Sequence, residues 1–135
     1  MNTILKVNNI TKTYNKGQQP SLDKVSFNVS EGEFIGIMGA SGSGKTTLLN
    51  VLSTIDKPTS GDIFINNINL KSLNDTCAAD FRKDNLGFIF QEYFLLDSLT
   101  IFENISVPLT LQKLNPDKIE NMVKSLAERF GIAPQ

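Results

Sequence analysis

The sequence contains no histidine and no tryptophan, and Cys77 is its only cysteine. Without histidine, the chain lacks both the usual general base of enzymes and the usual protein ligand of transition metals. A single cysteine excludes a disulfide framework and a metal site built from several thiolates, and no histidine is available to activate it as a nucleophile. Any chemistry must therefore use Mg²⁺ and carboxylates, or lie elsewhere.

The sequence also lacks a charge excess and a long apolar run. Lysine and arginine total 13 and aspartate and glutamate total 14, so the net charge is -1 and no long-range field attracts nucleic acid. No stretch approaches the roughly 18 apolar residues of a membrane span, and residues 1–6 do not resemble a secretion signal. We expect a cytoplasmic chain of 135 residues with one domain and no nucleic-acid partner.

The most specific motif is a glycine-rich loop between a strand pattern and a helix pattern. The apolar residues 33–38 predict a buried strand, and residues 46–52 predict the start of a helix. The loop between them fits Gly-x-x-x-x-Gly-Lys-Ser/Thr at every fixed position and consists of Gly39, Ala40, Ser41, Gly42, Ser43, Gly44, Lys45 and Thr46. Strand, loop and helix follow the order of a phosphate-binding loop.

The residue types of this loop suit a polyphosphate. Glycines let backbone amides approach the phosphates closely, and the following helix presents unpaired N–H groups to the same oxygens. Lys45 adds a full positive charge, and the Thr46 hydroxyl is placed to bind Mg²⁺. Thr47 is either a second phosphate contact or only a residue of the first helical turn. A tight connection without a ligand is the alternative for the whole loop, and the complete match argues against it.

Strand patterns surround this loop on both sides. Residues 5–13 and 22–29 predict two strands, which we expect to pair antiparallel because apolar and polar residues alternate in the second. Residues 62–66 predict a further strand, and the apolar residues 86–90 are typical of a central strand that ends at Gln91.

Helices are predicted in the second half of the chain. Residues 75–83 are expected to be helical, and Thr100 with Glu103 has the spacing of a capping box for a helix that Pro108 limits or kinks. The last helix has Asn115 as its cap and Gly131 as its stop.

Three features outside the loop have two interpretations each. Tyr14 either stacks on a nucleotide base or packs at the edge of the sheet. Gln91 either reaches a metal or the attacking water from the end of its strand, or is an ordinary loop residue. The four large side chains Tyr93, Phe94, Leu95 and Leu96 indicate either local burial or a docking surface.

The sequence as a whole resembles the ATP-binding subunit of ABC transporters. The resemblance rests on Tyr14, residues 39–49, residues 57–61 and the pair Phe90 and Gln91, in that order. It implies that Tyr14 stacks on adenine and that residues 39–47, including Thr47, form the Walker A loop. It also implies that Gln91 touches Mg²⁺ and the attacking water and couples the site to the membrane subunit.

Further segments resemble the branch that serves lipoprotein release, macrolide export and antimicrobial-peptide resistance. These segments are residues 69–73, 81–91 and 99–104. The resemblance then implies that residues 93–96 receive a coupling helix from a membrane permease. The substrate would be a peptide antibiotic or a lipoprotein, and the protein would be peripheral at the inner face of the cell membrane.

The resemblance implies an α/β fold of the P-loop NTPase class, with an N-terminal antiparallel β part, an incomplete central sheet and the start of a helical subdomain. Residues 1–92 would form the β part and the phosphate-loop core, and residues 93–135 the start of the helical subdomain. The cofactors would be ATP and Mg²⁺. The parent protein would dimerise with a second ATPase subunit, hydrolyse ATP and drive a permease.

The sequence departs from the family pattern at its end. It has no Leu-Ser-Gly-Gly-Gln signature, no Walker B acidic pair and no switch histidine. We therefore expect the N-terminal part of a longer ATPase, with little or no turnover by itself and with an exposed sheet edge that favours self-association. The alternative is a non-hydrolysing nucleotide-binding or interaction module. A small kinase is disfavoured because Arg82 and Arg129 are the only arginines.

Overall fold

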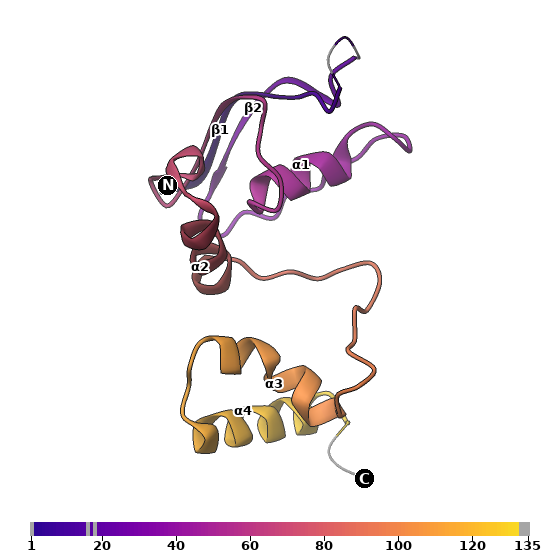
Figure 1. Ribbon diagram of the computed structural model, residues 1–135, viewed down its shortest axis with the longest axis vertical. Coiled ribbons are helices and arrows are strands. Elements are labelled where there is room, and N and C mark those ends of the chain that lie inside the picture. The colour runs from indigo at the N-terminus through magenta and orange to yellow at the C-terminus, as the bar shows by residue number, and fades with distance from the viewer. Residues whose placement is uncertain (1, 16, 18, 133–135) are drawn as a thin grey trace. The chain divides into compact units, whose positions relative to one another are not determined.

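The structure, a computed structural model, describes residues 2–15, 17 and 19–132. The chain divides into two compact units, residues 1–82 and residues 83–135, each of which is described by itself. Figure 1 shows the strands, α1 and α2 along the first part of the chain and α3 and α4 along the second. The first unit contains the glycine-rich loop.

The first unit is built on an antiparallel sheet. Its strands are β1 (Thr3–Lys12), β2 (Leu22–Ser30), β3 (Ser60–Ile65) and the short β4 (Ile68–Asn69), in the order β2-β1-β3-β4. In β2 the partly buried Val25 and Phe27 alternate with exposed polar residues, which is the pattern of a strand with one wet face. The predicted antiparallel pairing of the first two strands is confirmed.

Helix α1 (Lys45–Leu52) covers the apolar face of this sheet (Figure 1). Leu48 and Val51 are three residues apart, so they lie on the same side of the helix and are both buried. They form one core cluster with sheet residues from β1, β2 and β3, namely Val7, Ile10, Leu22 and Ile63. This packing fixes the start of α1, and with it the end of the glycine-rich loop, on the sheet.

A bulge in β1 lies against Gly61 of β3. Asn9 has a φ of 47°, and the register between β1 and β3 shifts between Asn8 and Thr11. Opposite it, Gly61 has a φ of 89°, and a Cβ atom there would lie 2.4 Å from the Asn9 carbonyl oxygen. Only glycine fits this position without a shift of the backbone.

A short 3-10 helix, η1 (Leu70–Ser72), leads into α2 (Asp75–Asn85), which confirms the predicted helix over residues 75–83. Ala78 and Phe81 are the buried residues of α2. The Arg82 guanidinium donates hydrogen bonds of 3.0 Å to both the carbonyl and the hydroxyl oxygen of Thr54. These bonds hold α2 to the turn that follows α1.

The second unit contains α3 (Ile101–Leu111) and α4 (Pro116–Arg129). The predicted capping box is present, with Thr100 and Glu103 satisfying each other's backbone N–H groups. Helix α3 runs through Pro108 to Leu111, so of the two predicted effects of Pro108, a limit or a kink, the limit is wrong. Asn115 caps α4 as predicted, and Gly131, with a φ of 68°, follows its end. Helix α4 buries one face, made of Ile119, Val123 and Ala127.

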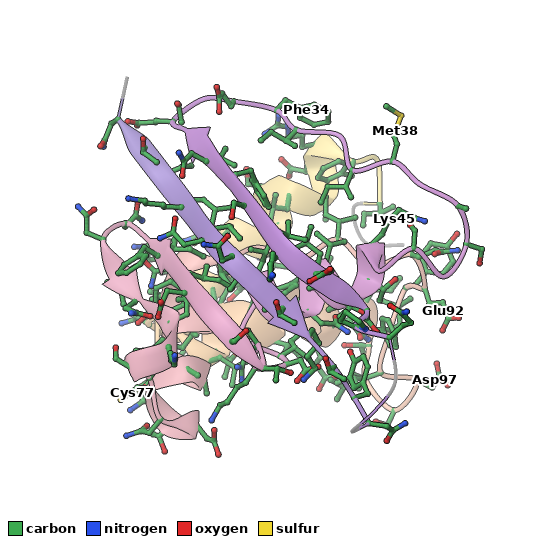
Figure 2. All side chains as sticks on the ribbon, turned by 90° about the horizontal axis from the view of Figure 1, so that it is seen from above. Phe34, Met38, Lys45, Cys77, Glu92 and Asp97 are labelled. Carbon is green, nitrogen blue, oxygen red and sulfur yellow. The ribbon has the colours of Figure 1, made fainter. Side chains whose placement is uncertain are left out.

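Two predicted strands are absent from the described residues. Residues 33–38 and 86–90 form no strand. Residues 33–38 and 87–90 are exposed and Leu86 is half-buried, so the prediction of a buried strand and of a central strand is wrong for both. Figure 2 shows Phe34 and Met38 beside the ribbon that leads to Lys45, and Phe34 is fully exposed. A strand buried on both faces needs hydrogen-bonded neighbours, and no described residue pairs with either segment.

None of the helices in the described part of the chain has the length and apolar character needed to cross a membrane.

Candidate phosphate-binding site

Two glycines give the loop its course. Gly42 and Gly44 have φ values of 77° and 91°, which L-amino acids with side chains rarely adopt. At Gly44 space is also lacking, because a Cβ atom would lie 2.3 Å from the carbonyl oxygen of Ser21. The end of the loop therefore passes directly over the chain that enters β2, and Gly44 becomes the residue before α1.

Lys45 ties the two ends of the loop together. Its ammonium donates hydrogen bonds of 2.8 Å to the Gly39 carbonyl and 2.7 Å to the Ala40 carbonyl. A third contact, to the Ser43 hydroxyl oxygen, is long at 3.5 Å. A lysine ammonium has three N–H donors, so two hold the loop closed, and the third would have to exchange its long contact with Ser43 for an incoming oxygen. The charge lies within the loop and not beside it.

The first turn of α1 has backbone donors with no partner among the residues that the structure describes. Gly44 offers no side-chain cap, and no acidic residue lies in the first turn. The N–H groups of residues 45–47 therefore point out of the helix end with its partial positive charge of about +0.5. An anion at this end would be bound by the backbone N–H groups and by Lys45 together.

Thr46 and Thr47 differ in position within this turn. Thr46 is exposed, and its hydroxyl donates to no residue that the structure describes, whereas Thr47 is half-buried. Among the described residues, no three acidic, histidine or cysteine side chains gather as a metal site. Mg²⁺ commonly binds through one or two protein groups together with substrate phosphates and water, so the exposed Thr46 hydroxyl fits that role.

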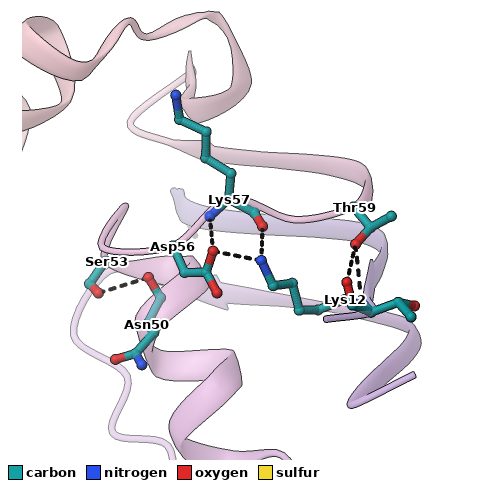
Figure 3. Close-up of polar contacts among 7 residues, drawn as sticks. Lys12, Asn50, Ser53, Asp56, Lys57 and Thr59 are labelled. Carbon is teal, nitrogen blue, oxygen red and sulfur yellow. Dashed lines mark hydrogen bonds and ion pairs between the residues drawn. The ribbon is translucent and has the colours of Figure 1, made fainter. Parts of the chain in front are cut away.

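Tyr14 lies just beyond β1, in the same unit as the loop, with its side chain exposed. The Lys12 ammonium lies 4.8 Å from the centre of the Tyr14 ring and is paired with Asp56 at 2.6 Å. Figure 3 shows Lys12 bonded at once to Asp56 and to the carbonyl of Lys57. Neither Lys12 nor Asp56 was predicted from the sequence as a site residue. Lys12 lies two residues before Tyr14, a spacing that places two side chains on one side of an extended chain, and this is the signal that could have pointed to Lys12.

The environment of Asp56 favours its charged form. Partial burial acts to raise the pKa of the carboxyl group. The hydrogen bond from Lys12 and the backbone N–H of Lys57, the charge of Lys12 and the Tyr14 hydroxyl together outweigh this effect, and the pKa lies below its ordinary value. The carboxylate is therefore ionised and paired at neutral pH.

Gln91 and the four residues that follow Glu92 belong to the second unit. Gln91 lies in an exposed bend and not at the end of a strand. Tyr93, Phe94, Leu95 and Leu96 are all exposed, so the interpretation of local burial is wrong. The ring of Phe94 meets the ring of Phe90 edge to face at 4.9 Å, and Phe90 stacks on Phe88 at 5.7 Å. These exposed side chains form an apolar surface on residues 88–96.

Known proteins with a similar sequence share one family. The family described as ABC transporter matches residues 22–135. The chain is 52% identical over 134 residues to the ABC transporter ATP-binding protein YxdL of Bacillus subtilis, which covers 98% of this chain and 52% of that protein. It is 48% identical over 131 residues to the bacitracin export ATP-binding protein BceA of Halalkalibacterium halodurans, at 96% and 52% coverage.

A solved structure agrees with the sequence comparison. The dimeric ATP-binding cassette MJ0796 of Methanocaldococcus jannaschii, in a post-hydrolysis state bound to ADP and Pi, matches with a TM-score of 0.80 and 39% identity. The match covers 88% of this chain and 53% of that chain. The chain thus spans about half the length of the relatives that it matches.

Proposed function

Because this chain belongs to the ABC transporter family, we propose that it binds MgATP through the loop of residues 39–47. One observation supports this proposal most directly. The Lys45 ammonium is held on the Gly39 and Ala40 carbonyls of the loop, the start of α1 has no side-chain cap, and no acidic side chain lies in its first turn. A triphosphate is the ligand class that such a concentration of donors suits.

Within this proposal, Lys45 keeps its two bonds to the loop and gives its third N–H to a phosphate oxygen. The N–H groups of Thr46 and Thr47 bind further phosphate oxygens, and the Thr46 hydroxyl binds Mg²⁺. Bound Mg²⁺ would neutralise part of the phosphate charge. Tyr14 would stack on the adenine base with its exposed ring.

The whole protein would use this site for transport. We place residues 1–92 in its β part and phosphate-loop core, and residues 93–135 at the start of its helical subdomain. Gln91 would contact Mg²⁺ and the attacking water, and the apolar surface of residues 88–96 would include the permease contact. The protein would hydrolyse ATP with a second ATPase subunit at the cytoplasmic face of the membrane and drive export of a peptide antibiotic or a lipoprotein. The name of the relative BceA, a bacitracin export protein, supports the first substrate class.

Calorimetric titration with MgATP tests the binding proposal. The unaltered chain should bind saturably and in a Mg²⁺-dependent manner, and Lys45→Ala should lose most of the affinity because it removes the only full charge inside the loop. Lys71→Ala is the matched control, since it removes the same charge from an exposed position outside the loop and should bind as the unaltered chain does. Equal affinity of Lys45→Ala and Lys71→Ala would contradict the proposal.

We expect the rate of ATP hydrolysis to differ between this chain and the full-length protein. Phosphoryl transfer needs groups placed around the whole transition state, and residues 39–47 supply only part of them. We therefore expect little or no phosphate release from MgATP by these 135 residues, and Lys45-dependent release by the full-length protein. A full-length protein that binds MgATP without hydrolysing it would favour the alternative, a non-hydrolysing nucleotide-binding module.

Self-association is a further part of the proposal for this chain. The exposed apolar residues 33–38 lead into the loop and have no partner strand among the described residues. Such a segment is a template for pairing with a second copy. Sedimentation velocity should show association that rises with concentration, and a monomer at every concentration would contradict it.

A further inference from the structure

The ammonium of Lys12 is held in one place by three groups. It donates 2.6 Å to an oxygen of Asp56 and 2.8 Å to the Lys57 carbonyl, and it lies 4.8 Å from the centre of the Tyr14 ring. Its side chain is only 12% exposed, although that of a lysine at the end of a strand is usually solvated. The position of the charge is therefore fixed, and one face of the Tyr14 ring is covered by a cation.

Asp56 connects this arrangement to the helix that carries the phosphate loop. The Asp56 N–H donates 3.0 Å to the carbonyl of Asn50 in α1, and its carboxylate accepts 2.7 Å from the Lys57 N–H. Figure 3 shows Asp56 between Lys12 and the end of α1. A continuous set of bonds thus runs from α1, which begins at Lys45, through Asp56 and Lys12 to the Tyr14 ring.

A second pair of bonds fixes the backbone next to Tyr14. The Thr13 N–H donates 3.0 Å to the Thr59 hydroxyl oxygen, and the Thr59 hydroxyl donates 3.3 Å to the Thr13 carbonyl. The residue before Tyr14 is therefore attached to the turn that enters β3. Thr59 thus holds the backbone next to Tyr14, and Asp56 and Lys57 hold the cation that covers one face of its ring; all three follow α1.

We propose that Lys12 and Asp56 are positioning residues for the nucleotide base, which hold the Tyr14 ring at a set place relative to the phosphate loop. Lys12 covers one ring face, and the base stacks on the opposite face. The inference rests on the proposed binding of MgATP. It also follows from charge, because a cation draws π-electron density toward its own side and leaves the other face better suited to an electron-rich purine.

Comparison of two ligands separates the contribution of the base to the binding affinity from that of the phosphates. We would titrate Mg²⁺-tripolyphosphate, which has no base, and MgATP into the unaltered chain and into Tyr14→Ala, Lys12→Met and Asp56→Asn. Lys12→Met keeps the length and apolar stem of the side chain and removes its charge. Lys71→Met is the control for the same change at an exposed site.

Loss of the stacking partner in Tyr14→Ala should weaken MgATP binding about tenfold. Lys12→Met and Asp56→Asn should weaken it about threefold or more, with tripolyphosphate binding unchanged in all three variants. Lys12→Met combined with Tyr14→Ala should bind MgATP no more weakly than Tyr14→Ala alone, because both changes act on one ring. Tripolyphosphate affinity that falls in parallel with MgATP affinity would mean a merely structural role and would overturn the inference.

A measurement on the unaltered chain avoids any dependence on the folding of variants. The methylene protons next to the Lys12 ammonium should have ring-current-shifted NMR signals because they lie over Tyr14. These shifts should persist when MgATP binds, and adenine protons should show contacts to the Tyr14 ring. Signals that return to their ordinary positions on binding would mean that the base displaces Lys12, and the inference would be wrong.

The outcomes for the two proposals differ. No MgATP binding by the unaltered chain, or full binding by Tyr14→Ala, would overturn the proposed base site and the inference with it. Weak binding by Tyr14→Ala with full binding by Lys12→Met would leave the proposed function intact and overturn only the positioning role.

Discussion

Replacement of Gly44 by alanine tests whether the loop requires a residue without a Cβ atom at this position. A Cβ atom at Gly44 would lie 2.3 Å from the Ser21 carbonyl oxygen and 3.2 Å from a methyl carbon of Leu22. Leu22 is the first residue of β2, and the N–H of Ser21 donates 2.7 Å to the Lys12 carbonyl, so a shift of their backbone would disturb the sheet. Gly42 provides a matched control, because its φ is also positive, at 77°, but a Cβ atom there would meet nothing within 4 Å.

The two variants should differ by the cost of the steric overlap. A positive φ costs an alanine about 1–2 kcal/mol, and this applies to both positions. The overlap at Gly44 adds about 1–3 kcal/mol, by analogy with overpacked cores. Gly44→Ala should therefore lower the free energy of unfolding of the first unit by about 2–5 kcal/mol, and Gly42→Ala by about 1–2 kcal/mol.

Amide hydrogen exchange is the suitable assay, because it reports on the first unit alone. Ile10 and Ile63 have side chains that are fully buried in the core between the sheet and α1. The hydrogen exchange rates of their backbone amides therefore measure how readily that core opens. Exchange in Gly44→Ala should be faster than in Gly42→Ala by about tenfold or more, since about 1.4 kcal/mol corresponds to a factor of ten. Equal exchange in the two variants would refute the close approach of the loop to β2.

Three further changes test other parts of the structure. Gly61→Ala should accelerate exchange across β1 and β3, because its Cβ atom would lie 2.4 Å from the Asn9 carbonyl oxygen, and unchanged exchange would contradict the close strands. The lowered pKa of Asp56 contributes stability that is fully present above the unfolded pKa of about 3.9 and lost as pH falls through the folded pKa. The difference in free energy of unfolding between the unaltered chain and Asp56→Asn, measured by urea unfolding, should therefore shrink below a pH of about 4. A difference that grew below this pH would contradict the lowered pKa of Asp56. Thr100→Ala removes the hydroxyl that accepts 3.2 Å from the Glu103 N–H and should destabilise α3 by about 0.5–2 kcal/mol, seen as faster exchange in its first turns.

Local signals made much of this fold predictable from the sequence. Thr100 with Glu103 and Asn115 before a proline are helix starts whose chemistry lies within four residues, and both helices begin where these signals indicate. The alternation of Val25 and Phe27 with polar residues predicted a half-buried antiparallel strand for the same reason. In each case the interaction that decides the structure is close in the sequence.

Features that depend on distant partners were not predictable. Residues 33–38 and 86–90 have the composition of buried strands, but a strand forms only when a neighbouring strand supplies its hydrogen bonds, and composition does not report on that neighbour. The bond between Lys12 and Asp56 joins residues 44 positions apart, so no local pattern reveals it. The same holds for the space at Gly44, which is limited by Ser21.

The central claim, that the loop of residues 39–47 binds the triphosphate of MgATP, is tested most directly by NMR titration of the backbone amides. We predict that the amides of residues 44–47 shift saturably with MgATP and that tripolyphosphate produces the same shifts. We also predict that Lys45→Ala abolishes them at the same concentrations. Saturable binding of MgATP that leaves these amides unmoved, or no binding by the folded chain, would contradict the claim.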